Sequence, residues 1–307
     1  MHSISPYTLR SYNPHSTEKK FEDRYSKLGQ AGQSDMFKVF KGYISSQDDT
    51  YKLVEDTKQV YRFCDFRFDE ARRSIDGWIW AGVYGTKNDI IDIETGKPDF
   101  EKTQKHAEII RHYVRFWIPA NLNEGIALLH GFRNHGIKTI LFNVLSAEFK
   151  RATTFTLHMN PLAYEKAFNE WKDAATKEIK VTRFTGLDDK ADIVRKLGHN
   201  EVEVSFKRGN LGRLSDYLNP ESDQARAIEV LKPLCATVKA KVKVGDKSRT
   251  FTLGAPVAQQ VCQIELDEED VLMKDGNPVN ESLHGWCTDL LKEYIEILYP
   301  RAGVKYE

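Results

Sequence analysis

The chain has 307 residues, 40% of them hydrophobic and 29% charged, so it can build a core and is not a disordered tail. Its 45 basic and 45 acidic residues cancel, which excludes a uniformly cationic surface but leaves the distribution of charge open. The sequence has no apolar run of about 18 residues and no apolar signal-peptide stretch, so we expect a cytoplasmic protein without direct membrane insertion.

The first third of the chain predicts a β-rich domain with an N-terminal helix. Phe21, Tyr25 and Leu28 are separated by four and three residues, which indicates a short amphipathic helix over residues 14–30. Aromatic and β-branched residues between turn signals then predict an antiparallel meander with strands at 37–44, 60–68, 75–84 and 109–118. We place this domain at residues 1–120, with its boundary near Pro119.

Beyond Pro119 strands and helices alternate, which predicts an α+β domain over residues 121–307 with mainly antiparallel strands. The expected strands are 137–145, 153–159, 179–184, 201–206 and 259–266, with a hairpin at 238–253. The expected helices are 161–174, 188–197, 222–231 and a terminal amphipathic helix from Leu283 to Leu298. The fold class predicted for the whole chain is therefore α+β.

The hairpin segment TVKAKVKVGDKSRTFTL has the sharpest local pattern. With a turn at Gly245–Asp246, strand alternation places the valines on one face and Lys239, Lys241 and Lys243 on the other. Lysines two residues apart on a strand are about 7 Å apart, or roughly two axial phosphate steps of a nucleic-acid strand. This face could follow a phosphate backbone without reading bases, or it could be a solvated face or a protected sheet edge.

Two further basic segments are candidates for phosphate contacts. Lys207, Arg208 and Arg213 follow a predicted strand, and the glycines between them allow a backbone to approach closely. The segment lacks the spacing of a P-loop, so a charged turn is the alternative. Lys150 and Arg151 lie between two predicted strands and have the same two interpretations.

Candidates for catalysis are weaker. The i, i+5 spacing of His130 and His135 fits no familiar ligand motif, and His158 lies near the end of a predicted strand. The acidic stretch from Glu265 to Asp270 could hold a cation or dock on a basic partner, although such residues are usually solvated. The four cysteines form no CxxC pair, so we expect reduced thiols. We predict no catalytic residue, metal site or cofactor.

The second domain resembles the Rex exclusion A proteins of temperate phages. The resemblance follows the order of elements through IPANLNEGIALLHGFRNHGIKTILFNVL, TTFTLHMNP, NEVEVSFKRGNLGRLSDYL and VLMKDGNPVNESLHGWCTDLLKEYIEIL. It implies a homodimeric, sequence-tolerant duplex-DNA binder that senses an infecting phage and signals to a membrane effector protein. By position it assigns Lys207, Arg208 and Arg213 to a basic segment after a strand, and it assigns no catalytic residues. The lysine hairpin is not part of it.

The sequence therefore favours a DNA-binding protein of an anti-phage exclusion or defence system, acting as a sensor. A metal-dependent nuclease or nucleotide-processing enzyme, centred on the histidines or the acidic stretch, is the first alternative. A protein-interaction or inhibitor module that uses the acidic stretch is the second. Metal-dependent turnover would favour the first alternative, and salt-insensitive binding to a protein would favour the second.

Overall fold

The computed structural model describes residues 2–133, 135–162, 173–182, 203–207, 211–219, 221–235, 237–244, 247–253, 262–266, 268 and 270–300. The chain divides into two compact units: unit 1 comprises Met1–Pro6 and Asn160–Glu307, and unit 2 comprises Tyr7–Met159. The division falls after Met159, whereas the sequence placed it near Pro119. Each unit combines helices with antiparallel strands, so the predicted α+β class is confirmed.

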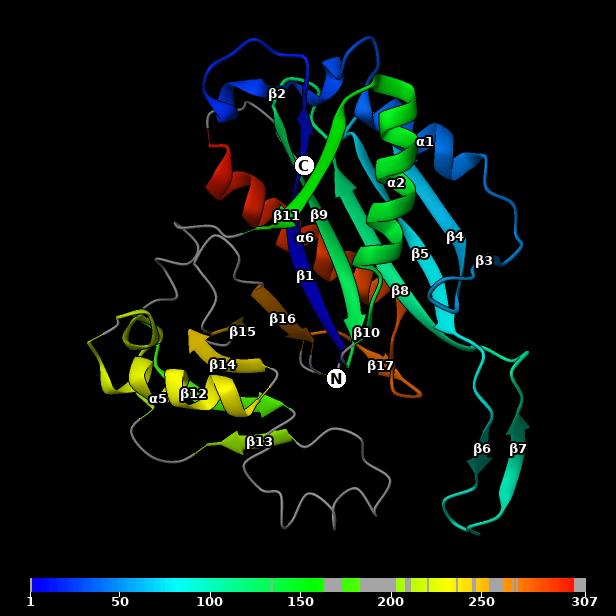
Figure 1. Cartoon of the computed structure of the whole chain (residues 1–307), viewed down its shortest axis with the longest axis vertical. Helices are drawn as coiled ribbons and strands as arrows, with labels where there is room; N and C mark the ends of the chain where they lie inside the picture. Colours follow the sequence, from blue (N-terminus) through cyan, green and yellow to red (C-terminus); the bar gives the residue numbers. More distant parts are fainter. Residues whose placement is uncertain are drawn as a thin grey trace. The chain divides into compact units, whose positions relative to one another are not determined.

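Unit 2 is built on an antiparallel meander (Figure 1). Its sheet order is β9 (Glu124–Phe132), β8 (Glu108–Trp117), β5 (Ser74–Val83), β4 (Gln59–Asp69) and β3 (Lys52–Val54). Strands β6 (Asn88–Ile91) and β7 (Pro98–Lys102) form a separate hairpin between β5 and β8. Three of the four strands predicted for this meander, at 60–68, 75–84 and 109–118, are thus confirmed.

Smaller strands complete the description of unit 2. Strand β1 (His2–Tyr12) is divided between the units, and its Ser11 and Tyr12 pair with β2 (Tyr25–Ser26). Strand β10 (His135–Gly136) pairs with β9, and β11 (Thr156–Pro161) follows the second helix.

Two segments predicted as strands are helices that cover the meander. Residues 37–44 lie in α1 (Met36–Ser45). Asp35 caps the start of this helix, because its side chain accepts a hydrogen bond from the Phe37 amide. Residues 137–145 lie in α2 (Lys138–Thr153), whose buried Leu141, Leu145 and Phe149 recur every four residues. Aromatic and branched residues suit strands as well as helices. In both segments the buried residues recur at the spacing of a helix, and both segments are helical.

The predicted N-terminal helix is also wrong. Residues 14–30 form no α-helix but short 3₁₀ turns, at Phe21–Arg24 and Leu28–Gln30, with strand β2 between them. Phe21 and Tyr25 contact the ring of Tyr12 on β1, with centroids 5.1 and 5.8 Å apart. The spacing of Phe21 and Tyr25 therefore does not mark the face of a helix. These two residues belong to an aromatic cluster that packs on strand β1.

Asp76 and Gly77, which have the residue types of a turn, lie inside β5. A Cβ at Gly77 would fall within 2.6 Å of the Phe66 ring, so glycine is needed there for close approach of β4 and β5.

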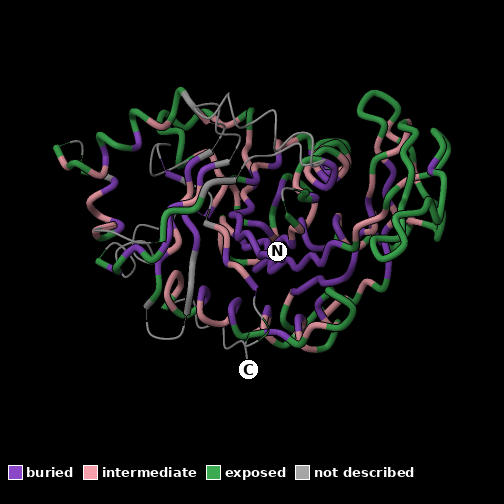
Figure 2. The backbone as a smooth tube through the Cα atoms, turned by 90° about the horizontal axis from the view of Figure 1, so that it is seen from below, coloured by how far each residue is buried: buried purple, intermediate pink, exposed green. Residues whose placement is uncertain are grey.

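The core of unit 2 lies between the meander and its two helices. Phe40 of α1 and Phe149 of α2 are fully buried, and both rings meet edge to face in this core, with Phe40 also against Phe116 of β8. Figure 2 shows that buried and exposed stretches alternate along the chain. The opposite face of β4, β5 and β8 carries Arg62, Trp80 and Arg111, which align across the three strands.

Unit 1 contains its own run of antiparallel strands. Its order is β13 (Glu203–Phe206), β12 (Thr176–Thr182), β14 (Thr237–Val244), β15 (Lys247–Thr252) and β16 (Cys262–Leu266). The first residues of β1 pair with β16, with Ser3 opposite Glu265. Short strands β17 (Met273–Lys274) and β18 (Asn277–Pro278) form a hairpin.

The helices of unit 1 begin and end close to where the sequence placed them. Helix α5 (Asp223–Leu231) is capped by Ser222, whose hydroxyl accepts from the Ala225 amide at 3.0 Å. Helix α6 (Asn280–Leu298) buries the predicted apolar stripe, including Leu283, Leu290 and Leu291. The helices predicted at 161–174 and 188–197 fall largely or wholly outside the described residues. Among the described residues, no helix is both long and apolar enough to cross a membrane.

Candidate functional site

Strand alternation divides the sheet of unit 1 into an apolar and a polar face. Val238, Ala240 and Val242 of β14 are at most 2% exposed, and Ile179 and Val181 of β12 are buried beside them. Lys239, Lys241 and Lys243 occupy the alternate positions of β14, opposite Thr252, Thr250 and Ser248 of β15. The predicted separation of valines and hairpin lysines is confirmed for the described side chains.

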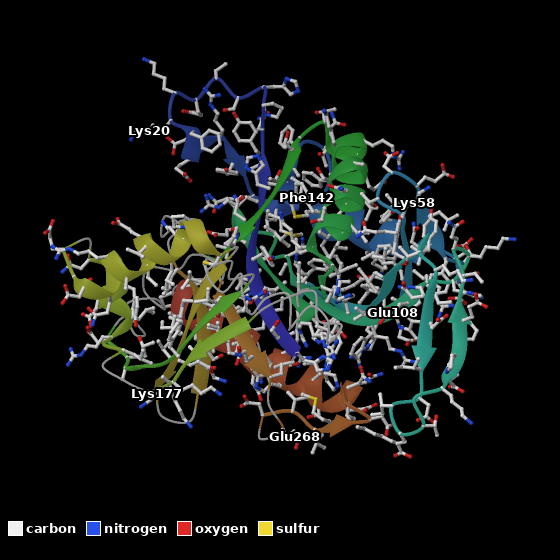
Figure 3. All side chains as sticks on the ribbon, turned by 60° about the horizontal axis from the view of Figure 1, so that its bottom comes forward. Lys20, Lys58, Glu108, Phe142, Lys177 and Glu268 are labelled. Atoms are coloured by element: carbon white, nitrogen blue, oxygen red, sulfur yellow. The ribbon has the colours of Figure 1, made fainter. Side chains whose placement is uncertain are left out.

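Neighbouring strands add charged residues to this polar face. In the strand register Lys180 is opposite Lys239, and Glu178 is opposite Lys241. A bulge at Lys177, labelled in Figure 3, interrupts the alternation at the start of β12. Lys207, which follows β13, reaches Glu178 with a nitrogen–oxygen distance of 3.6 Å. The polar face thus gathers cations from three parts of the sequence.

Glu265 of β16 is the centre of the most buried part of this face. Its carboxylate accepts a hydrogen bond from Lys241 Nζ at 2.7 Å and lies 3.7 Å from Lys180 Nζ. The side chains of Glu265 and Lys180 are only 12% and 13% exposed. Burial acts to raise the pKa of Glu265, but the hydrogen bond from Lys241 and the charges of Lys180 and Lys241 outweigh it and lower the pKa. This carboxylate is therefore ionised and paired at neutral pH.

The remaining lysines are more accessible. Lys239 donates to Gln263 Oε1 at 2.8 Å. Lys243 is exposed and forms no ion pair with a described residue. We call the five lysines Lys180, Lys207, Lys239, Lys241 and Lys243, with Glu178 and Glu265, the lysine face. Five cations against two carboxylates leave this set with a net charge of +3.

Arg213, Lys150 and Arg151, which were also predicted as DNA contacts, lie outside the strands of this face. Arg213 is exposed at the start of a 3₁₀ turn, where its backbone amide donates to Asp216 at 2.7 Å. Arg208 lies outside the described residues. Lys150 and Arg151 lie in unit 2, in the last turn of α2 and not between strands, and Arg151 pairs with Glu148 at 2.6 Å. Of the predicted set, the structure brings together Lys207, Lys239, Lys241 and Lys243.

Glu178, Lys180 and Gln263 were not predicted as site residues, and Glu265 was predicted only as part of an acidic stretch that could hold a cation or a basic partner. The signal for them is the alternation in TKEIKVT and QIEL, where charged or amide residues occupy every second position. To place these residues beside the hairpin lysines, one must know that β12 pairs with β14 and that β15 pairs with β16. The pattern within each strand does not give these pairings.

The histidines do not form a catalytic cluster among the described residues. His130 is buried, and its carbonyl oxygen lies 3.0 Å from Nδ1 of His112, whereas His135 is exposed. His158 Nδ1 hydrogen-bonds to the Tyr25 hydroxyl at 2.9 Å, and burial with the charge of Arg10 lowers the pKa of His158. No group of three potential metal ligands occurs in the described parts of the chain.

Comparison with known proteins does not assign the chain to a family: no family model, no curated protein and no solved structure matches it.

Proposed function

We propose that the protein binds duplex DNA with little sequence preference through the lysine face. The observation that carries the proposal is the excess of five lysines over two carboxylates among the described charged side chains of the lysine face. Lysine ammonium groups on flexible stems contact phosphates as point charges, and such contacts position a protein on DNA without reading bases.

The pairing within the face separates two kinds of lysine. Lys180 and Lys241 contact Glu265, so they hold the strands together and are poorly available to a phosphate. Lys207 and Lys243 are the exposed lysines of the face that remain to engage DNA, and Lys207 is exposed beyond its 3.6 Å contact with Glu178. About two phosphate contacts predict a slope of log affinity against log salt of roughly −2 for B-DNA.

A role in phage defence extends this proposal. The Rex exclusion A resemblance supports a DNA sensor that acts with a membrane effector protein, and it offers no catalytic residue. A sensor of this kind needs broad DNA affinity, which a lysine face supplies and a base-reading helix does not.

Fluorescence anisotropy on unrelated duplexes across a salt series tests the proposal. We expect binding at low salt with a slope near −2, and equal affinities for the duplexes to within a few-fold. Lys243→Glu should flatten the slope by about one unit. Lys274→Glu, at an exposed lysine of β17 outside the face, is the matched control and should bind like the parent. Absence of binding at low salt would refute DNA binding.

A further inference from the structure

The β6–β7 hairpin of unit 2, here called the arm, projects away from β5 and β8 (Figure 1). Ile90, Ile91 and Phe100 are each about half exposed, and Ile93 at its turn is 93% exposed. Side chains project from the arm on both sides in Figure 3, beyond the labelled Glu108 at the start of β8. Four large apolar side chains exposed within eleven residues mark a surface that another molecule covers.

The arm is also acidic. Asp89, Glu94 and Asp99 are exposed and form no ion pair with a described residue, whereas Glu101 pairs with Lys87. Asp92 serves the turn itself, accepting hydrogen bonds from the amides of Glu94 and Thr95. An apolar segment with three unpaired carboxylates is a poor match for an anionic bilayer or a nucleic acid, and fits a cationic, apolar protein surface.

Such a surface exists on the same unit. Trp80 lies between Arg62 and Arg111 in the strand register, with the two guanidinium carbons 4.6 and 4.5 Å from its ring centroid. Neither arginine forms an ion pair with a described carboxylate. Arg62 donates a hydrogen bond to the backbone carbonyl oxygen of Asp49, and the Asp49 carboxylate is close enough to stabilise the positive charge of Arg62.

Apolar side chains surround these arginines. Leu53, on the edge strand β3, is 62% exposed, and Tyr51 and Ile109 lie at the margins. We call Tyr51, Leu53, Arg62, Trp80, Ile109 and Arg111 the Trp80 patch. Aromatic residues and arginine are the types enriched at protein interfaces.

We propose that the arm of one copy of this chain docks on the Trp80 patch of a second copy, so that two arms are exchanged about a twofold axis. The arm offers apolar side chains and carboxylates that form no described ion pair. The patch offers apolar side chains and guanidiniums that form no described ion pair. Both surfaces are exposed within one unit, so the arm does not cover its own patch. When both arm–patch contacts form within one pair of chains about a twofold axis, the dimer is closed.

Sedimentation velocity over a concentration series gives the first test. We expect a dimer for the full chain. Ile91→Asp with Ile93→Asp on the arm, or Arg111→Glu on the patch, should each weaken self-association at least about tenfold. Val230→Asp, at a residue of α5 that is 67% exposed, is the control and should leave the dimer intact. Circular dichroism checks that each variant is folded.

A charge-reversal mixture identifies the two partners. One chain carries Asp89→Lys, Glu94→Lys and Asp99→Lys on the arm, and the other carries Arg111→Glu on the patch. Each chain alone places like charges together and should be monomeric, whereas the mixture joins opposite charges at both contacts and should form a heterodimer. A monomeric wild-type chain, a dimer that resists both sets of changes, or a mixture that stays monomeric would overturn the proposal.

Discussion

The two units hold surface cations in different ways. On the lysine face of unit 1, Lys241 donates a hydrogen bond to Glu265 and Lys180 forms an ion pair with it. Both lysine side chains are largely buried. On the Trp80 patch of unit 2, Arg62 and Arg111 stack on an indole and have no carboxylate ion pair among the described residues. A buried lysine requires a nearby carboxylate, because its ammonium group loses water. A stacked guanidinium keeps its edge available to a partner. The first arrangement therefore stabilises the unit, and the second leaves charge available for binding.

The largest expected effect follows from removing the shared carboxylate. Glu265→Ala removes the carboxylate that the largely buried Lys180 and Lys241 share, and we expect a loss of about 3 kcal/mol in the free energy of unfolding. Glu229→Ala, at an exposed residue of α5 without an ion pair among the described residues, is the control and should cost less than about 0.5 kcal/mol. Urea unfolding measures both values. Equal effects for the two variants would mean that Glu265 is not a structural centre.

The same carboxylate predicts a dependence of stability on pH. The pKa of Glu265 is lower in the folded chain than its ordinary value of 4.5, so the unfolded chain binds this proton more readily. The stability that Glu265 contributes is therefore complete above pH 4.5 and is lost as the pH falls through the lower, folded-state pKa. The stability difference between the parent and Glu265→Gln should shrink from about pH 6 to about pH 3. A difference that stays constant over this range would contradict the pairing.

A smaller effect is expected on the Trp80 patch. Arg111→Ala removes one exposed cation–π contact, and we expect a loss of about 0.5–1 kcal/mol in the free energy of unfolding. Thermal or urea unfolding of the dissociated chain at low concentration separates this loss from any effect on self-association. A loss above about 2 kcal/mol would show that Arg111 is part of the fold and not a free surface residue.

The sequence predicted the fold best where one pattern had one explanation. The terminal stripe of α6 and the alternation of the hairpin lysines needed no knowledge of other segments. Residues 37–44 and 137–145 form helices, although their aromatic and branched residues suit strands as well as helices. The cap at Asp35 and the four-residue recurrence of Leu141, Leu145 and Phe149 point to helices.

The candidate site was predictable only in part. Lysines on the polar side of β14 follow from local alternation, but their partners do not. Glu178 and Glu265 lie far from the hairpin in sequence and meet it only through strand pairing. The histidines gave no such signal, and in the structure His130 is buried while His158 hydrogen-bonds to Tyr25. Nonlocal register is therefore the information that a single sequence lacks.

The most direct test of the account separates binding from stability on the lysine face. Lys207→Glu with Lys243→Glu changes the two exposed lysines, and Glu265→Gln changes the buried centre. We expect the double variant to lose duplex-DNA affinity at low salt while its free energy of unfolding changes little. We expect Glu265→Gln to lose stability while its DNA affinity stays equal or rises, because a negative charge is removed. Parent-like DNA affinity in the folded double variant would contradict the account.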